Sequence, residues 1–172
     1  MATIHAQEEG FRLLSEGKIK EFNRWRMMPK NLIIKLDFSG RSFSDMDVSG
    51  ALLNGIIADK ASFDHANLTS TNLVQASLNG ADLKGANLTG TLLMYAEMND
   101  ARLANTTLTK TNMMWANLQN ADLTDSRMLQ TVFVEANLQN AIVAGVDKAG
   151  AYLKYAKLEG TSWSEHAPAQ YQ

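Results

Sequence analysis

The sequence contains no cysteine among its 172 residues. This absence excludes a disulfide framework, a thiolate metal site and a cysteine nucleophile. It also suits a reducing compartment, so we expect the chain to be cytoplasmic. No apolar run approaches the roughly 18 residues that a transmembrane helix needs. The first residues also lack the pattern of a secretory signal, so we expect no membrane partner.

Neither sign of charge dominates, since 16 Lys and Arg stand against 18 Asp and Glu for a net charge of −2. A nucleic-acid-binding surface would need a clear basic excess, so we expect no direct nucleic-acid binding. The three histidines, His5, His65 and His166, lie far apart in the sequence. No zinc-protease motif, nucleophile elbow or phosphate loop is present. We therefore expect no enzyme, no cofactor and no metal.

Proline is scarce as well, with Pro29 and Pro168 as the only two. Between them the sequence repeats with a period of five. A large apolar residue occupies all but two of the 26 positions spaced five apart from Phe38 to Trp163. The residue two places earlier is small or β-branched along most of this segment. A period of five fits neither the 3.6 of a helix nor the 2 of a flat strand.

Two inward positions in every five residues suit a chain that turns a corner every five residues. Four corners close a square coil of 20 residues, and stacked coils pair through their backbones. The 26 repeats predict about 6.5 coils, and a spacing of about 4.8 Å makes the solenoid roughly 31 Å tall. Proline would remove a donor from each ladder, so its absence fits this geometry. Lys148, at a central position, must snorkel outwards or mark a local distortion.

Six tripeptides in this segment combine alanine, asparagine or aspartate, and leucine. They are Ala66-Asn67-Leu68, Ala81-Asp82-Leu83, Ala86-Asn87-Leu88, Ala116-Asn117-Leu118, Ala121-Asp122-Leu123 and Ala136-Asn137-Leu138. With them the sequence resembles the pentapeptide-repeat family over about residues 36–163. The resemblance implies an all-β solenoid, the right-handed quadrilateral β-helix of that family. The match weakens where Leu36, Arg41, Met46 and Ile56 fill small-residue positions, so we expect a wider or irregular first coil.

The resemblance also implies one candidate function. Some members of the family resemble B-form DNA in shape and charge, bind DNA gyrase and protect it from quinolones. The weak net charge of this chain argues against such mimicry. No long loop interrupts the repeat, although some gyrase-protecting members have one.

The chain divides into three segments. Residues 1–30 are expected to form a helical cap, residues 31–165 the β-helix, and residues 166–172 a C-terminal tail. In the cap, Phe11, Phe22 and Trp25 belong to one apolar helical stripe, Gly17 ends a first helix and Pro29 stops a second. A partner-docking arm is the alternative reading of this block.

Residues 20 apart stack on one side of a square coil, so outward residues can be sorted by side. Three sides are mostly polar. The fourth side is built on Leu73, Leu93, Met113, Phe133 and Leu153. Its outward positions form an apolar stripe of Leu92, Met94, Tyr95, Met114, Trp115, Val132, Val134, Tyr152 and Tyr155. Such patches usually mark interaction sites, although corner residues that only pack on one another are the alternative.

The sequence therefore predicts a non-enzymatic interaction or scaffold module that uses the apolar stripe. The partner is another protein or a second copy, and a two-fold dimer is the simplest arrangement because one patch then covers itself. The main alternative is a gyrase-binding DNA mimic. An enzyme or small-molecule binder would need a pocket at the helical cap, lined by Arg24, Trp25 and Arg26.

Overall fold

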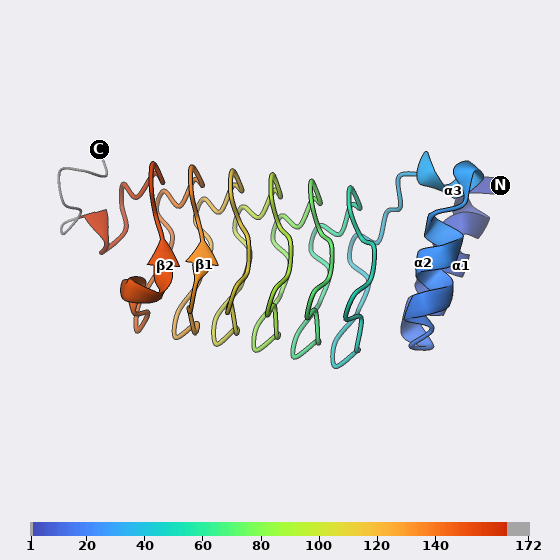
Figure 1. Cartoon of the computed structure of the whole chain (residues 1–172), viewed down its shortest axis with the longest axis horizontal. Helices are drawn as coiled ribbons and strands as arrows, with labels where there is room; N and C mark the ends of the chain where they lie inside the picture. Colours follow the sequence, from blue (N-terminus) through green and yellow to red (C-terminus); the bar gives the residue numbers. More distant parts are fainter. Residues whose placement is uncertain (1, 165–172) are drawn as a thin grey trace.

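The computed structural model describes residues 2–164 and shows a rod with helices at one end and stacked coils along the rest (Figure 1). Helices α1 (Ala2–Ser15), α2 (Ile19–Arg26) and α3 (Pro29–Leu32) come first. The short strands β1 (Thr131–Val132) and β2 (Ala151–Tyr152) and the 3-10 helix η1 (Lys148–Gly150) lie in the last coils. The tail expected over residues 166–172, and His166 with it, lies outside the described residues.

The coils form the right-handed quadrilateral β-helix that the period of five predicts. Along most of the solenoid, the residue before each large central residue pairs in parallel with the residue 20 positions later, as Asn72 does with Leu92. The large central residue and the small residue two places earlier both point inwards. Leu73 and Thr71, for example, are both 0% exposed. The predicted fold, including its N-terminal helices, is confirmed.

Each corner is a tight turn that needs a left-handed residue. The Ala76 N–H donates to the Leu73 carbonyl at 3.1 Å and closes one such turn. The residue before Ala76, Gln75, has φ 58°, and the same position is left-handed at most other corners. Type II turns have a positive φ at this position. The strain is offset by a backbone bond to the next coil, here from the Gln75 N–H to the Met94 carbonyl at 2.9 Å.

A column of buried threonines runs along one edge of the solenoid. The hydroxyls of Thr71, Thr91, Thr111 and Thr131 donate to carbonyls of the preceding coil at distances of 2.7 to 3.0 Å. Ser126 fills the equivalent position on another edge and is 4% exposed. Its Oγ has no hydrogen-bond partner among the described residues. The threonine hydroxyls therefore stabilise the fold, whereas the Ser126 hydroxyl destabilises it, because a buried hydroxyl without a partner is unfavourable.

The cap closes the first coil by supplying partners for its backbone. The Asn23 Nδ2 donates to the Gly50 carbonyl at 2.9 Å, and the Asn23 Oδ1 accepts from the Leu52 N–H at 2.9 Å. Arg26 is 6% exposed and donates to the carbonyls of Asn31 and Ile34 at 2.7 and 2.8 Å. Burial lowers the pKa of this guanidinium from its usual value. The helices are thus held on the first coil by hydrogen bonds from side chains of α2 to backbone groups.

The first coil is regular, so the predicted irregularity is wrong. Asp37, Ser42 and Asp47 pair with the residues 20 positions later in the same register as the later coils. Arg41, one of the four unusual residues, contacts the cap instead. It forms an ion pair with Glu8 and lies 4.8 Å from the centroid of the Phe11 ring. This departure from the repeat lies where the helices dock.

Helix α3 is a second departure from the sequence prediction. Pro29 was expected to stop the preceding helix, but α2 already ends at Arg26 and Pro29 opens α3 as its first residue. Proline suits that position because the first helical N–H needs no partner.

The predicted distortion at Lys148 is present as η1. The Asp147 carboxylate caps this turn by accepting from the Ala149 N–H at 2.9 Å. Gly150 comes so close to the preceding coil that a Cβ there would overlap the Met128 carbonyl. Glycine is therefore required at position 150 because a side chain would not fit there, and not because the backbone needs a positive φ.

We predict that Thr111→Val and Ser126→Ala change stability in opposite directions. Thr111→Val removes a buried hydrogen bond and should lower the free energy of unfolding by about 1 kcal/mol. Ser126→Ala removes a buried hydroxyl without a partner and should leave that free energy unchanged or raise it. Urea denaturation followed by circular dichroism measures both. A Ser126→Ala variant as unstable as Thr111→Val would contradict the assignment.

We also predict that Gly150→Ala destabilises the protein more than Gly55→Ala does. Gly55 has φ +68° and open space around its Cα, so alanine there costs only left-handed strain, about 1 kcal/mol. At Gly150 the added methyl overlaps a backbone carbonyl and should cost about 2 to 3 kcal/mol. Thermal unfolding of the two variants compares the costs directly, and equal midpoints would contradict the prediction.

Candidate protein-interaction surface

The nine residues of the apolar stripe lie on the side of the solenoid that carries β1 and β2 (Figure 1). One row runs from Leu92 through Asn112 to Val132 by parallel pairing, and Val132 then pairs with Tyr152. The neighbouring positions follow in step, because the Tyr95 N–H donates to the Met114 carbonyl at 3.1 Å. Four successive coils thus contribute to one continuous surface.

The stripe contains both protruding and half-buried side chains. Tyr95 and Trp115 are 50% and 40% exposed, and Tyr152 and Tyr155 are 55% and 56% exposed. Leu92 is exposed as well, while Met94, Met114, Val132 and Val134 are half-buried between these larger side chains. The half-buried aliphatic side chains thus form an apolar surface from which the exposed aromatic side chains protrude.

The coil repeat stacks two of these aromatic rings. The Tyr95 and Trp115 rings lie 4.8 Å apart between centroids, with an interplanar angle of 11°. Both residues are left-handed corners one coil apart, so the spacing of the backbone sets the spacing of the rings. One face of each ring is therefore covered by the other.

Two charged side chains accompany the stripe. Glu135 follows Trp115 in the corner column and is exposed, and its N–H donates to the Lys154 carbonyl at 3.0 Å. The Lys154 Nζ lies 4.9 Å from the centroid of the Tyr155 ring. A partner on this surface therefore meets a carboxylate in the middle of the stripe and an ammonium group at its outer end.

The structure adds exposed apolar residues that the sequence reasoning missed. Leu129 is 59% exposed at the neighbouring corner, where earlier coils carry the threonines Thr89 and Thr109. A leucine in a column of threonines could have indicated it. A second group, the cap patch, consists of Met27, Met28, Leu32 and Ile33, and Ile33 is 88% exposed.

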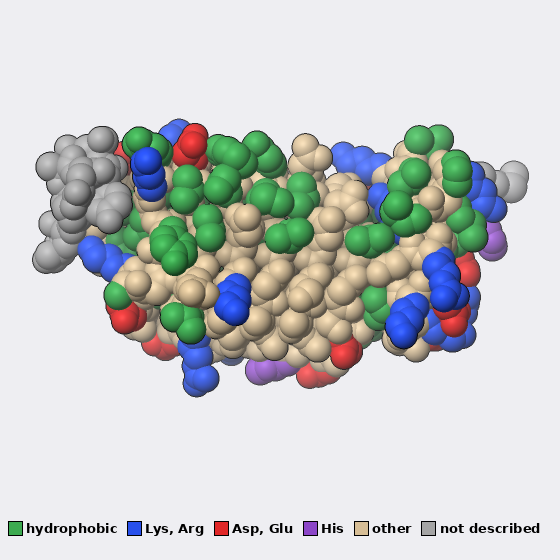
Figure 2. Space-filling view, in the orientation of Figure 1, with side chains coloured by type: hydrophobic (Ala, Val, Ile, Leu, Met, Phe, Trp, Pro, Cys, Tyr) green, Lys and Arg blue, Asp and Glu red, His purple; other side chains and the backbone are tan. Residues whose placement is uncertain are grey.

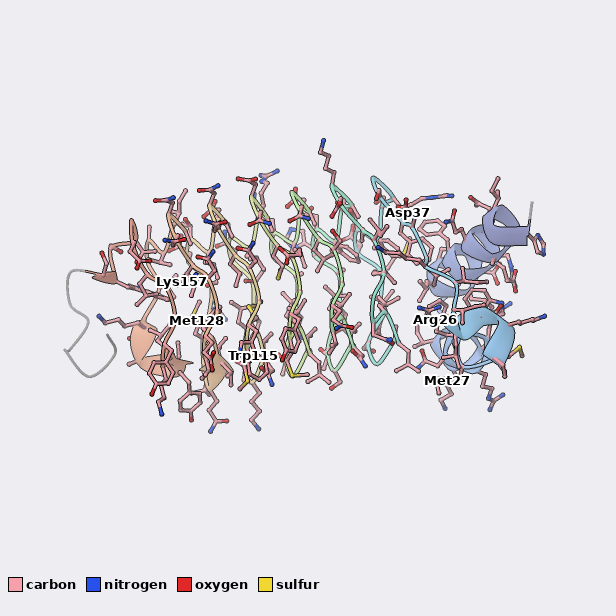
Figure 3. The ribbon with its side chains drawn as sticks, turned by 90° about the horizontal axis from the view of Figure 1, so that it is seen from above. Arg26, Met27, Asp37, Trp115, Met128 and Lys157 are labelled. Atoms are coloured by element: carbon pink, nitrogen blue, oxygen red, sulfur yellow. The ribbon has the colours of Figure 1, made fainter. Side chains whose placement is uncertain are left out.

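The cap patch and the apolar stripe share one side of the rod. Figure 2 shows hydrophobic side chains gathered over the helices and over the end that carries β1 and β2, with mostly polar surface between and below. Seen from above, Met27 and Trp115 lie toward the same edge (Figure 3). The two patches therefore lie near opposite ends of one face.

The cap also contains a hollow. A cavity of about 350 Å³ is lined by His5, Ala6, Glu9, Trp25, Lys30, Asn31 and Ile34. Of the three residues expected to line a pocket here, only Trp25 does so, and Arg26 is instead buried among carbonyls. Within residues 2–164, no cluster of three or more His, Asp or Glu side chains is placed to hold a metal ion. No described helix is long and apolar enough to cross a membrane.

The comparison with protein families gives one match. The family model of pentapeptide repeats (8 copies) matches residues 47–85, 71–109, 96–133 and 111–147, which together span more than half of the chain. A search of curated proteins gives no match.

Two solved structures are similar to the chain in fold. HetL, described as a pentapeptide repeat protein involved in heterocyst differentiation regulation in the cyanobacterium Nostoc sp. strain PCC 7120, is 27% identical with a TM-score of 0.70. The match covers 73% of this chain and 58% of HetL, so the chain spans less than two thirds of that relative. A pentapeptide repeat protein of the Arabidopsis thaliana thylakoid lumen is 27% identical over 55% of this chain and 66% of its own, with a TM-score of 0.54.

QnrB1, described as a plasmid-mediated fluoroquinolone resistance protein, is more distant. Its full-length structure is 18% identical over 74% of both chains, with a TM-score of 0.39.

We predict that the stripe contributes little to folding. Trp115→Ala removes a half-exposed stacked ring and should lower the free energy of unfolding by about 1 kcal/mol. Phe133→Ala, at a fully buried central position of the same side, should cost about 3 to 5 kcal/mol. Chemical denaturation of both variants tests the contrast. A Trp115→Ala variant as unstable as Phe133→Ala would show that Trp115 is structural.

Proposed function

The chain belongs to the pentapeptide-repeat family, and we propose that it is a non-enzymatic protein-interaction module that binds through the apolar stripe. The partner is another protein or a second copy of the chain. The observation that carries the proposal is the continuous exposure of aromatic and apolar side chains on one side of the rod. Contiguous apolar patches on soluble proteins usually mark interaction sites.

The make-up of the stripe supports this proposal. Tryptophan, tyrosine and methionine are enriched at protein interfaces, and aromatic residues dominate binding hot spots. The Tyr95 and Trp115 rings already fix one another by stacking. A partner therefore pays less conformational entropy to order these side chains on binding. The half-buried Met94 and Met114 between them add an adaptable floor.

The polar sides offer a contrast, because their side chains are largely satisfied by one another. The Asn99 Nδ2 donates to the Asn79 Oδ1 at 2.8 Å, and the Ser77 hydroxyl donates to Asp59 at 2.6 Å. Such ladders follow the coils and hold the outward amides in place. A partner binding there would have to break existing hydrogen bonds, whereas the stripe offers apolar surface that gains from leaving water.

Gyrase-directed DNA mimicry is less well supported. A mimic of the DNA backbone needs regularly spaced, unpaired negative charge. On the coils, Arg102 pairs with Asp82 of the preceding coil at 2.9 Å and so neutralises that column. The net charge is only −2. The core of the coils is filled by buried side chains, which supports a non-enzymatic role. The cytoplasmic location expected from the composition remains a prediction.

We predict that Trp115→Glu abolishes capture of the protein's partner. A carboxylate in the middle of the stripe would lose its hydration when a partner covers it. Burying an unpaired charge is strongly unfavourable, so binding should be lost. Immobilised wild-type and Trp115→Glu proteins are incubated with native lysate, and bound proteins are quantified by mass spectrometry. Ile142→Glu is the matched control, because Ile142 is 53% exposed on another side.

The expected result is a specific protein, or the chain itself, that is retained by the wild type and by Ile142→Glu but lost from Trp115→Glu. Equal retention by all three proteins would overturn the proposed function. Circular dichroism of each variant checks that the coils remain folded.

A further inference from the structure

We infer that the occupant of the apolar stripe is the cap patch of a second copy, packed side by side and antiparallel. This inference rests on the proposed function, because it names the partner of the same surface. A two-fold axis perpendicular to the long axis of the rod would relate the copies. Each copy would then contribute its stripe and its cap patch to one interface.

The size of the stripe is the first argument. Four coils at about 4.8 Å each span only about 19 Å along the rod. A standard interface buries about 800 Å² on each partner, which corresponds to a patch about 28 Å across. The stripe alone is therefore short for a stable complex. A second apolar contact on the same face would bring the buried area into the usual range.

The cap patch supplies that second contact. Met27, Met28 and Leu32 are 58%, 45% and 51% exposed, and Ile33 is the most exposed of the four. None of these side chains lines the cavity at the cap. The patch lies at one end of the face and the stripe lies towards the other (Figures 2 and 3). A two-fold axis midway between them places each patch on the other, and both contacts form at once.

The surface between the patches fits such a contact. It consists of the outward residues that this side carries around Leu53 and Leu73. These residues are uncharged: Leu52, Asn54, Gly55, Asn72, Val74 and Gln75. Bringing two copies together there would desolvate no unpaired ion, which is the costliest event at an interface.

Charge selects the antiparallel arrangement over the parallel one. Arg24, Lys30 and Lys35 are exposed on and beside α2 and α3, around the cap patch. A parallel pair would bring these three basic residues against their own copies. The antiparallel pair brings them to the stripe, where Glu135 is exposed among the apolar side chains. Lys154 lies at the outer end of the stripe, held over the Tyr155 ring.

The absence of cysteine makes a direct test possible. Single variants Met28→Cys and Val134→Cys are mixed in equal amounts and oxidised, and the disulfide-linked species are identified by intact mass. The antiparallel pair predicts the mixed Met28→Cys/Val134→Cys dimer as the main product. Ile142→Cys, on another side, is the control and should not cross-link to either. Dominant self-linking of Met28→Cys would indicate parallel copies and overturn the inference.

Sedimentation equilibrium gives the second readout. The wild type should dimerise, and both Trp115→Glu and Ile33→Glu should raise the dimer Kd at least about tenfold, as expected for loss of a central contact. A monomeric wild type would overturn the inference. If that monomer still captures a lysate protein through Trp115, the proposed function stands without it. A dimer unchanged by Trp115→Glu would overturn the inference, whereas only equal lysate capture by the wild type and Trp115→Glu would overturn the proposed function.

Discussion

The parallel pairing of each residue with the residue 20 positions later is the constraint on which the rest of the structure depends. It satisfies backbone groups along most of the coils and repeats from coil to coil, as in the row from Asn72 through Leu92 to Asn112. Because the register does not slip, each outward side chain lies directly beside its counterpart in the next coil. Residues 20 apart in the sequence therefore form a column along one side of the rod. The residue types in these columns determine whether that side is polar or apolar.

Much of this could be predicted from sequence because the rule is local and repeated. The period of five identifies the inward residues, and the period of 20 assembles the nine stripe residues on one side. Three features were not accessible in this way. The regular first coil, helix α3 and the exposure of Met27 and Ile33 depend on how the helices dock, through Asn23 and Arg26. This docking depends on tertiary contacts made by residues outside the repeat, so the repeat pattern does not predict it.

The surfaces of the rod divide according to how their side chains are satisfied. Amide and hydroxyl ladders, such as Asn79 with Asn99, use up the polar groups of the walls. In the stripe, Tyr95 and Trp115 are ordered by stacking, and Lys154 lies over the Tyr155 ring. Polar ladders thus cover much of the walls, while the stripe leaves a continuous apolar surface exposed. The filled core behind the stripe holds its backbone in place.

The left-handed corners have a consequence for how such a chain can evolve. A corner side chain leans over the next coil, so that a Cβ added at Gly85 would run into the His65 ring. Likewise the Asn140 amide occupies the space beside Gly160. Two corner residues 20 positions apart must therefore fit each other, either as a large residue beside a glycine, as here, or as two rings that stack, as Tyr95 and Trp115 do. Neutral drift at the corners should leave a covariation at a separation of 20.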